Sequence, residues 1–126
     1  MLAKANRVVL AEDFRAAVRR GRRASTPSAV YYRLPTDPAH PLRFGVIVSK
    51  AVGNAVSRNL VRRRLRALGR SRVDAGNRGE DVVIRVLPAS ADVSGRDVSQ
   101  HSWDSLSADM HAALDSPAGP AKGAGR

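Results

Sequence analysis

The segment from Pro38 to Val73 contains no Asp or Glu, and it holds a helix pattern with two distinct faces. At about 100° per residue, Val61, Leu65 and Leu68 fall within about 60° of one another, which makes a narrow apolar stripe. A basic face lies beside this stripe, formed by Arg58, Arg62, Arg63, Arg66 and Arg70. The stripe has to be buried against another layer, so the chain must fold as packed secondary-structure layers around this helix.

The basic face has no acidic residue within its own segment to neutralise it. Arginines one turn apart repel one another by a few tenths of a kcal/mol, and a merely solvated helix face usually mixes both signs of charge. Binding of a polyanion offsets that repulsion, so we favour a binding surface over a solvated face. The turn at Gly53-Asn54 directly precedes the helix and is able to present backbone N–H groups to a phosphate.

The charge of the whole chain supports a nucleic-acid partner. Lys and Arg number 22 against 11 Asp and Glu, which gives a net charge of +11. Such an excess favours RNA or DNA over an acidic membrane surface. Composition alone also fits a ribosomal or nucleoid protein, so it identifies a class of partner and nothing finer.

Several other classes of protein are disfavoured. The chain has no Cys, which excludes disulfides and thiolate metal sites. No apolar run approaches the ~18 residues of a membrane span, and the N-terminus lacks a secretory signal pattern, so we expect a cytoplasmic protein without a membrane partner. His40, His101 and His111 show no ligand spacing, so we predict no metal site and place them at the surface or at helix edges.

Hydrophobic periodicity predicts one α+β domain over residues 1–115, followed by a disordered tail over 116–126. Helices are predicted at 11–21, 50–70 and 98–114, strands at 28–34, 42–49 and 80–87, a weak edge strand at 22–25 and a loop at 71–79. Because a short turn joins strands 28–34 and 42–49, we expect these two strands to pair antiparallel. Trp103 lies on the apolar stripe of the last helix and is expected to anchor that helix in the core.

One segment resembles the signature of a known family. The run Lys50-Ala51-Val52-Gly53-Asn54-Ala55-Val56-Ser57-Arg58-Asn59, followed by Arg62-Arg63 and Leu65-Arg66, is similar to the signature of the bacterial ribonuclease P protein. Other parts of the family pattern occur in order: Asn6-Arg7 and Glu12-Asp13-Phe14 near the start, Arg43 to Lys50 before the signature, and Pro88-Ala89-Ser90 before the last helix. The resemblance covers roughly residues 6–114.

The resemblance implies a fold and a role. The fold is an α-β-β-β-α-β-α sandwich with a four-stranded sheet and a left-handed βαβ crossover, shared with a domain of a ribosomal protein. The role is to assist endonucleolytic removal of the 5′ leader of precursor tRNA. The family's active site lies in the RNA subunit with Mg²⁺, so no catalytic or metal-binding residue is expected in the protein. No obligate protein partner is expected.

The resemblance also implies two groups of binding residues. Contacts to the ribonuclease P RNA are expected from Lys50, Asn54, Arg58, Asn59, Arg62, Arg63 and Arg66. The single-stranded leader is expected in a cleft on the sheet, against Phe14 and Tyr32, although either ring could instead be a core residue.

The sequence departs from the family pattern at two positions. Leu60 stands where many members have a third signature arginine, and Arg64 is a candidate to replace it. Val18 stands where some members have a second cleft aromatic. The rival hypotheses are a ribosomal or other structural RNA-binding protein without processing activity, and a protein-only nuclease.

Overall fold

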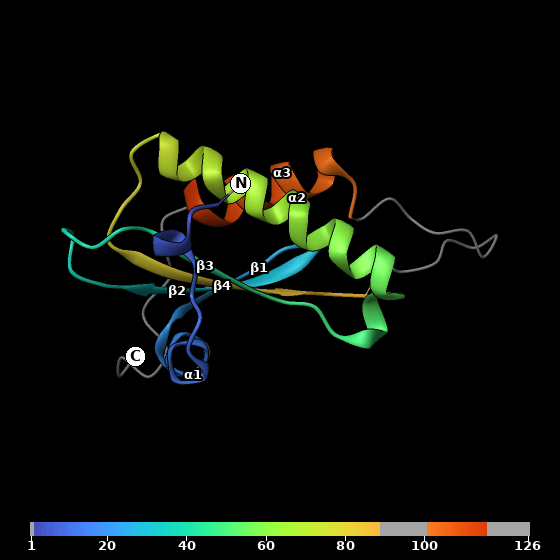
Figure 1. The fold of residues 1–126 in the computed structure, drawn as a ribbon, viewed down its shortest axis with the longest axis horizontal. Coiled ribbons are helices and arrows are strands. Elements are labelled where there is room, and N and C mark those ends of the chain that lie inside the picture. The colour runs from blue at the N-terminus through green and yellow to red at the C-terminus, as the bar shows by residue number, and fades with distance from the viewer. Residues whose placement is uncertain (1, 89–100, 116–126) are drawn as a thin grey trace.

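The computed structural model describes residues 2–88 and 101–115, and the predicted order of helices and strands is confirmed within them (Figure 1). The weakly predicted edge strand is present as β1. The elements are η1 (Lys4–Asn6), α1 (Ala11–Arg20), β1 (Arg22–Ser25), β2 (Ala29–Pro35), β3 (Arg43–Ile47), η2 (Lys50–Val52), α2 (Ala55–Asp74), β4 (Glu80–Val86) and α3 (Trp103–Asp115). The predicted tail at 116–126 and the first residues of the predicted last helix lie outside the described residues.

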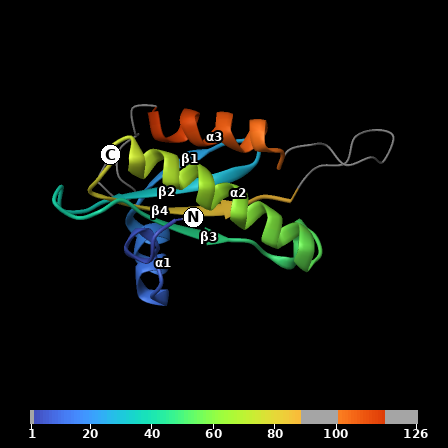
Figure 2. The same cartoon turned by 45° about the horizontal axis from the view of Figure 1, so that its top comes forward.

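The sheet separates two helical layers, with α2 and α3 on one face and α1 on the other (Figures 1 and 2). The larger core lies between the sheet and the α2–α3 layer, where the predicted stripe of Val61, Leu65 and Leu68 is buried. A smaller cluster lies under α1, formed by Ala17, Val30, Tyr32 and Val83. Both faces of the central strands are therefore apolar, as a sheet covered on two sides requires.

The predicted antiparallel pairing of strands 28–34 and 42–49 is wrong. The order of strands is β1-β2-β4-β3, so β4 lies between β2 and β3; it pairs antiparallel with β2 and parallel with β3. The short turn crosses the start of β4: the N–H of Thr36 donates to the carbonyl of Gly79 at 2.8 Å, and the N–H of Gly79 donates to the carbonyl of His40 at 2.8 Å. A turn of this length can bridge two strand spacings of about 4.8 Å each, so adjacency along the chain did not force adjacency in the sheet.

The parallel pair β3–β4 is connected through α2, which is the βαβ unit that the resemblance implies. Gly69 allows α2 to approach the sheet closely. A Cβ atom there would lie 2.9 Å from Cδ2 of Phe44, so a larger residue would push the helix away from β3. This contact sets how closely α2 packs on the sheet.

Helix α2 continues to Asp74, four residues beyond the predicted end at Arg70. Val73 packs against the main core, and Arg70 forms an i,i+4 ion pair with Asp74 at 3.3 Å. Arg72 forms an ion pair with Asp115 of α3 at 2.6 Å. These contacts stabilise a last turn that has little helix signal in the sequence.

The prediction that Trp103 anchors the last helix in the core is wrong. Its side chain is 45% exposed, whereas Leu106 and Met110 of the same stripe are buried. Trp103 has the right angular position on the helix, but it is the first residue of α3. A residue at the end of a helix has neighbours on one side only, so the burial of the stripe begins one turn later.

Gly45 supports the packing of α1 on the sheet, and its replacement gives a first test of the fold. A Cβ atom at Gly45 would lie 2.5 Å from Cε1 of Phe14 and 3.1 Å from Cβ of Val8. We expect Gly45→Ala to lower the free energy of unfolding by about 1–3 kcal/mol through overpacking, measured by urea denaturation. Adding Phe14→Ala should then cost less than it does in the wild-type background, and simple additivity of the two losses would contradict the contact.

Candidate RNA-binding surface

The turn before α2 is built from the residues that the resemblance assigns to RNA contact. Lys50 is exposed in η2, and Gly53 has a φ of 155°, which a side chain would disfavour. The side-chain oxygen of Asn54 accepts a hydrogen bond from the N–H of Ser57 at 2.9 Å and so caps the N-terminus of α2. Asn54 therefore has a structural role beside its predicted contact.

An arginine face runs along the first three turns of α2 and consists of Arg58, Arg62, Arg63 and Arg66. Within residues 2–88 and 101–115, none of these four has a carboxylate within ion-pair distance. Arg62 donates to the side-chain oxygen of Asn59 at 3.3 Å, and the Nε of Arg58 is buried without a hydrogen-bond partner there. Among the described residues, no carboxylate therefore offsets the positive charge of this face.

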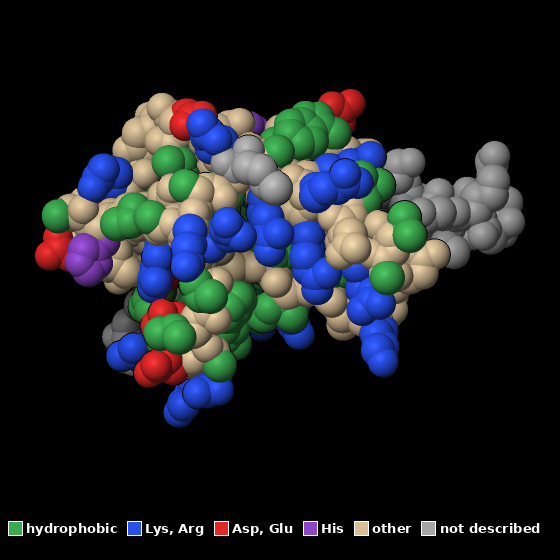
Figure 3. Space-filling model, in the orientation of Figure 1, with side chains coloured by type: hydrophobic (Ala, Val, Ile, Leu, Met, Phe, Trp, Pro, Cys, Tyr) green, Lys and Arg blue, Asp and Glu red, His purple; other side chains and the backbone are tan. Residues whose placement is uncertain are grey.

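Part of the arginine face borders a shallow hollow, and Figure 3 shows Lys and Arg side chains aligned along α2. The hollow has a volume of about 470 Å³. It is lined by Val56, Asn59, Arg62, Arg63 and Arg66. A concave surface with fixed cations at its edge suits the phosphates of a folded RNA, because phosphate contacts supply most of the affinity in such complexes.

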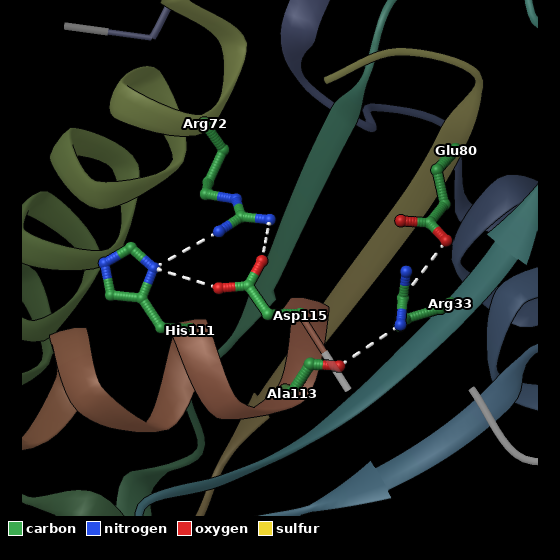
Figure 4. Close-up of polar contacts among 6 residues, drawn as sticks. All are labelled: Arg33, Arg72, Glu80, His111, Ala113 and Asp115. Atoms are coloured by element: carbon green, nitrogen blue, oxygen red, sulfur yellow. Dashed lines mark hydrogen bonds and ion pairs between the residues drawn. The ribbon is translucent and has the colours of Figure 1, made fainter. Parts of the chain in front are cut away.

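The C-terminal half of α2 is electrostatically different. Arg70 is paired with Asp74, and Arg72 donates to Asp115 of α3 at 2.6 Å and contacts Nδ1 of His111 at 3.2 Å (Figure 4). The hydrogen bond from Arg72 lowers the pKa of Asp115 below its usual value, and the charge of Arg72 adds to this. Arg70, which widens the basic face in the sequence, is therefore already neutralised.

Arg64, the candidate to replace the missing signature arginine at Leu60, already makes a contact within the fold. Its guanidinium donates to the backbone carbonyl of His101 at 2.8 Å and so ties α2 to the segment before α3. Leu60 lies one turn before Arg64 on α2. It is therefore on the same side of the helix as Arg64, and not on the side of Arg62 and Arg66.

On the opposite face of the sheet, α1 is held at one end by an ionic cluster. The guanidinium of Arg43 donates to both carboxylate oxygens of Asp81, at 2.8 and 2.7 Å, and to Asp13 of α1 at 3.5 Å. The hydrogen bond to Asp81 is the main cause of the raised pKa of Arg43. Asp13 thus fixes one flank of α1 toward Arg43, and the flank with Phe14 and Val18 faces the other way.

Beyond that flank the described helices leave part of the sheet uncovered, and we name this part the open sheet face: Ile47, Arg85 and Leu87. Ile47 and Leu87 are half-buried and Arg85 is exposed. The register pairs Arg85 with both Ile47 and Val30, so these side chains point to the α1 side. In Figure 3 hydrophobic side chains are visible beside α1, in the recess between α1 and the η2 end of the molecule.

The two predicted leader-binding aromatics differ in accessibility. Phe14 is half-buried at the edge of the open sheet face, and its ring lies over Gly45. Tyr32 is only 4% exposed and belongs to the cluster beneath α1. The burial of Tyr32 favours the core alternative for that residue, whereas Phe14 has a surface that a base could reach.

Arg85 was not predicted from the sequence as a binding residue. It is an exposed arginine on a central strand whose neighbours along the chain, Ile84 and Val86, are buried. The sequence did contain a signal for its exposure, because Arg85 is the single charged residue within the apolar run 82–87. A buried strand tolerates a charge only where the side chain reaches solvent.

Together the fold and the arginine face define a small basic RNA-binding domain of the α+β class. The family model for ribonuclease P matches residues 2–110. The chain therefore belongs to the ribonuclease P protein family, whose members are the protein subunits of a ribonucleoprotein endoribonuclease.

Curated relatives and solved structures agree with this assignment. The chain is 45% identical to the ribonuclease P protein component of Clavibacter michiganensis over 114 residues, covering 90% of this chain and 94% of the relative. It is 47% identical to that of Streptomyces bikiniensis over 100 residues, covering 73% and 81%. The fold is shared with the RNase P proteins of Staphylococcus aureus (TM-score 0.70, 21% identity, 89% and 94% covered) and Thermotoga maritima (TM-score 0.70, 18% identity, 90% and 98% covered).

Across the described helices, none combines the length and the apolar character needed to cross a membrane. In the same residues His101 and His111 use their rings for local contacts: Nε2 of His101 lies 2.7 Å from the carbonyl oxygen of Leu87, and His111 contacts Arg72. Groups of three or more His, Asp or Glu able to hold a metal ion do not occur there.

Proposed function

We propose that the arginine face of α2 docks on the ribonuclease P RNA and that the open sheet face beside α1 holds the 5′ leader of precursor tRNA. The observation that carries the proposal is the charge of Arg58, Arg62, Arg63 and Arg66, for which the described part of the chain supplies no carboxylate partner. The last three of these arginines also line a hollow on the same helix. The two surfaces lie on opposite sides of the sheet, so one small protein can contact the catalytic RNA and its substrate together.

The proposed contribution to cleavage is positional and electrostatic. Several of the protein's carboxylates are occupied in holding the fold: Asp81 binds Arg43, Asp109 accepts from the N–H of Ser28, and Asp115 binds Arg72. These three carboxylates are already bonded within the fold, and in line with the family resemblance we assign Mg²⁺ and bond cleavage to the RNA. By neutralising phosphates and orienting the leader, the protein would let the RNA hold its substrate at lower Mg²⁺.

Reconstitution tests this function directly. The purified chain is added to ribonuclease P RNA and precursor tRNA at limiting Mg²⁺, and 5′ processing is measured. We expect stimulated cleavage. RNA binding without stimulation would support a structural RNA-binding protein instead, and cleavage without added RNA would support a protein nuclease.

The leader contact is tested at Phe14. We expect Phe14→Ala to weaken binding of leader-bearing tRNA to the holoenzyme by about 1–3 kcal/mol, the usual contribution of one base–aromatic stack. Binding of mature tRNA, which has no leader, should stay close to wild type.

Phe14→Leu is the matched control, because it keeps an apolar side chain over Gly45 but removes the ring. It should retain more stability than Phe14→Ala while losing the same leader affinity. Tyr32→Ala provides the contrast, since its buried ring predicts equal losses for both substrates. An equal loss for both substrates at Phe14 would assign that ring to the core as well.

A further inference from the structure

Trp103 is the largest apolar side chain that the fold leaves exposed in the described part of the chain. It is the first residue of α3, on the same side of the sheet as the arginine face, whereas Leu106 and Met110 of the same helix are buried. Figure 3 shows hydrophobic side chains over the start of α3, with Lys or Arg side chains next to them. An apolar ring therefore stands beside a basic surface.

Hydrogen bonds on both sides hold the backbone around Trp103 in place. The carbonyl of His101 accepts from Arg64 of α2 at 2.8 Å, and Nε2 of His101 lies 2.7 Å from a backbone carbonyl oxygen just after β4. The hydroxyl oxygen of Ser102 accepts from the N–H of Ser105 at 3.1 Å and so caps the first turn of α3. A ring on a fixed backbone loses little conformational entropy when a flat partner stacks on it, which favours binding.

The contact between α2 and the segment before α3 also joins Trp103 to the arginine face. Arg63 lines the hollow, and the next residue, Arg64, reaches His101. Arg64 donates to a carbonyl, and among residues 2–88 and 101–115 no carboxylate lies within ion-pair distance of it. Helices that pack side by side have their axes about 8–10 Å apart, so an RNA docked on α2 lies within reach of the start of α3.

The size and the surroundings of the exposed ring favour a single nucleobase as its partner. A stable protein interface buries about 800 Å² on each partner. The other large hydrophobic residues that are exposed in the described part of the chain lie elsewhere: Val56 in the first turn of α2, and Val9 and Leu10 directly before α1. The carboxylate of the exposed neighbour Asp104 would repel a phosphate, whereas the uncharged face of a base can stack on the indole.

We propose that Trp103 stacks on an unpaired base of the ribonuclease P RNA and so extends the RNA-docking surface from α2 onto α3. This inference rests on the proposed docking of the arginine face and adds to it a contact that is not electrostatic. Since Trp103 neutralises no phosphate, its contribution to RNA affinity should be nearly independent of salt concentration, unlike that of the arginines. Stacking is also tolerant of base identity.

The first test measures the affinity of the full chain for ribonuclease P RNA over a range of salt concentrations. We expect Trp103→Ala to weaken binding roughly tenfold, as for one lost base–aromatic stack, and to leave the salt slope unchanged. Trp103→Phe keeps an aromatic ring and should bind within about threefold of wild type. Trp103→Leu is the matched control, because it keeps an apolar side chain without the ring and should lose as much affinity as Trp103→Ala.

The second test follows the ring itself in the wild-type protein. Trp103 is the only tryptophan in the sequence, so intrinsic tryptophan fluorescence reports on this position alone. We expect ribonuclease P RNA to quench that fluorescence and to shield the ring from acrylamide, because a stacked base covers it. An equal concentration of precursor tRNA without the RNA subunit should leave the ring accessible to acrylamide.

The outcomes separate this inference from the proposed function. A loss of affinity at constant salt slope, with shielding by ribonuclease P RNA, supports the stack. Wild-type affinity in Trp103→Ala, shielding by precursor tRNA instead, or fluorescence that depends on protein concentration without RNA, as contact with a second copy would cause, would each overturn it. The α2 docking would still stand if Arg58→Ala/Arg62→Ala/Arg66→Ala lowers the salt slope. An unchanged slope in that triple variant would overturn the docking of α2, and the stack with it.

Discussion

Replacing Arg58, Arg62 and Arg66 together with Ala should weaken binding to the ribonuclease P RNA by the order of a hundredfold at physiological salt. Each neutralised phosphate contributes about 0.9 to the slope of log affinity against log salt, so three lost contacts reduce the slope by about 2.7. From a 1 M reference to ~0.15 M salt, that slope corresponds to roughly two orders of magnitude in the dissociation constant. The measurement is RNA affinity as a function of salt concentration.

Two controls isolate the charge of the arginine face. The triple Lys variant keeps three cations on the same helix, so its salt slope should stay near wild type even if bidentate geometry is lost. Arg70→Ala removes an arginine that Asp74 already neutralises, and it should change RNA affinity less than Arg62→Ala does. An unchanged salt slope in the triple Ala variant would show that this face is not the docking surface.

The second large effect is expected on stability, at Asp81. This carboxylate is 7% exposed and accepts two hydrogen bonds from Arg43 of the neighbouring strand. Asp81→Asn removes the negative charge and one of the two acceptors, and leaves Asp13, at 3.5 Å, as the one described carboxylate in contact with Arg43. We expect a loss of about 3 kcal/mol in the free energy of unfolding, at the lower end for a broken buried pair because Arg43 keeps some access to water. The measurement is denaturant or thermal unfolding.

Asp74→Asn is the matched control for Asp81→Asn. It breaks the ion pair with Arg70, whose two side chains are 50% and 61% exposed. Exposed i,i+4 pairs contribute only about 0.3–0.5 kcal/mol, so this variant should unfold close to wild type. Similar losses from the two variants would contradict the structural role of the Arg43–Asp81 pair.

The sequence predicted elements well wherever the signal was local. The period of Val61, Leu65 and Leu68 located α2 and its buried side, alternation located β3, and a run rich in Val and Ile located β4. Sequence patterns did not predict features that depend on a residue far away along the chain. The last turn of α2 is stabilised in part by the contact of Arg72 with Asp115, 43 residues away along the chain.

The candidate site, too, was predicted from the sequence only in part. The arginine face could be predicted because its members lie on one helix, where spacing alone fixes their relative positions. The open sheet face could not, because Ile47 and Arg85 become neighbours only through the β3–β4 register. The structure also separated Tyr32 from Phe14: one is buried beneath α1, and the other reaches the surface.

The amino-acid sequence by itself determined the helices, the strands, the basic face of α2 and the segment that resembles the family signature, because each depends on residues close together in the chain. Only the tertiary structure placed β4 between β2 and β3, joined Arg43 to Asp81 and exposed Trp103. The physical reason is that both faces of the strands are apolar and several pairings bury them about equally well, so strand order is selected by the packing of the whole molecule and not by any one segment.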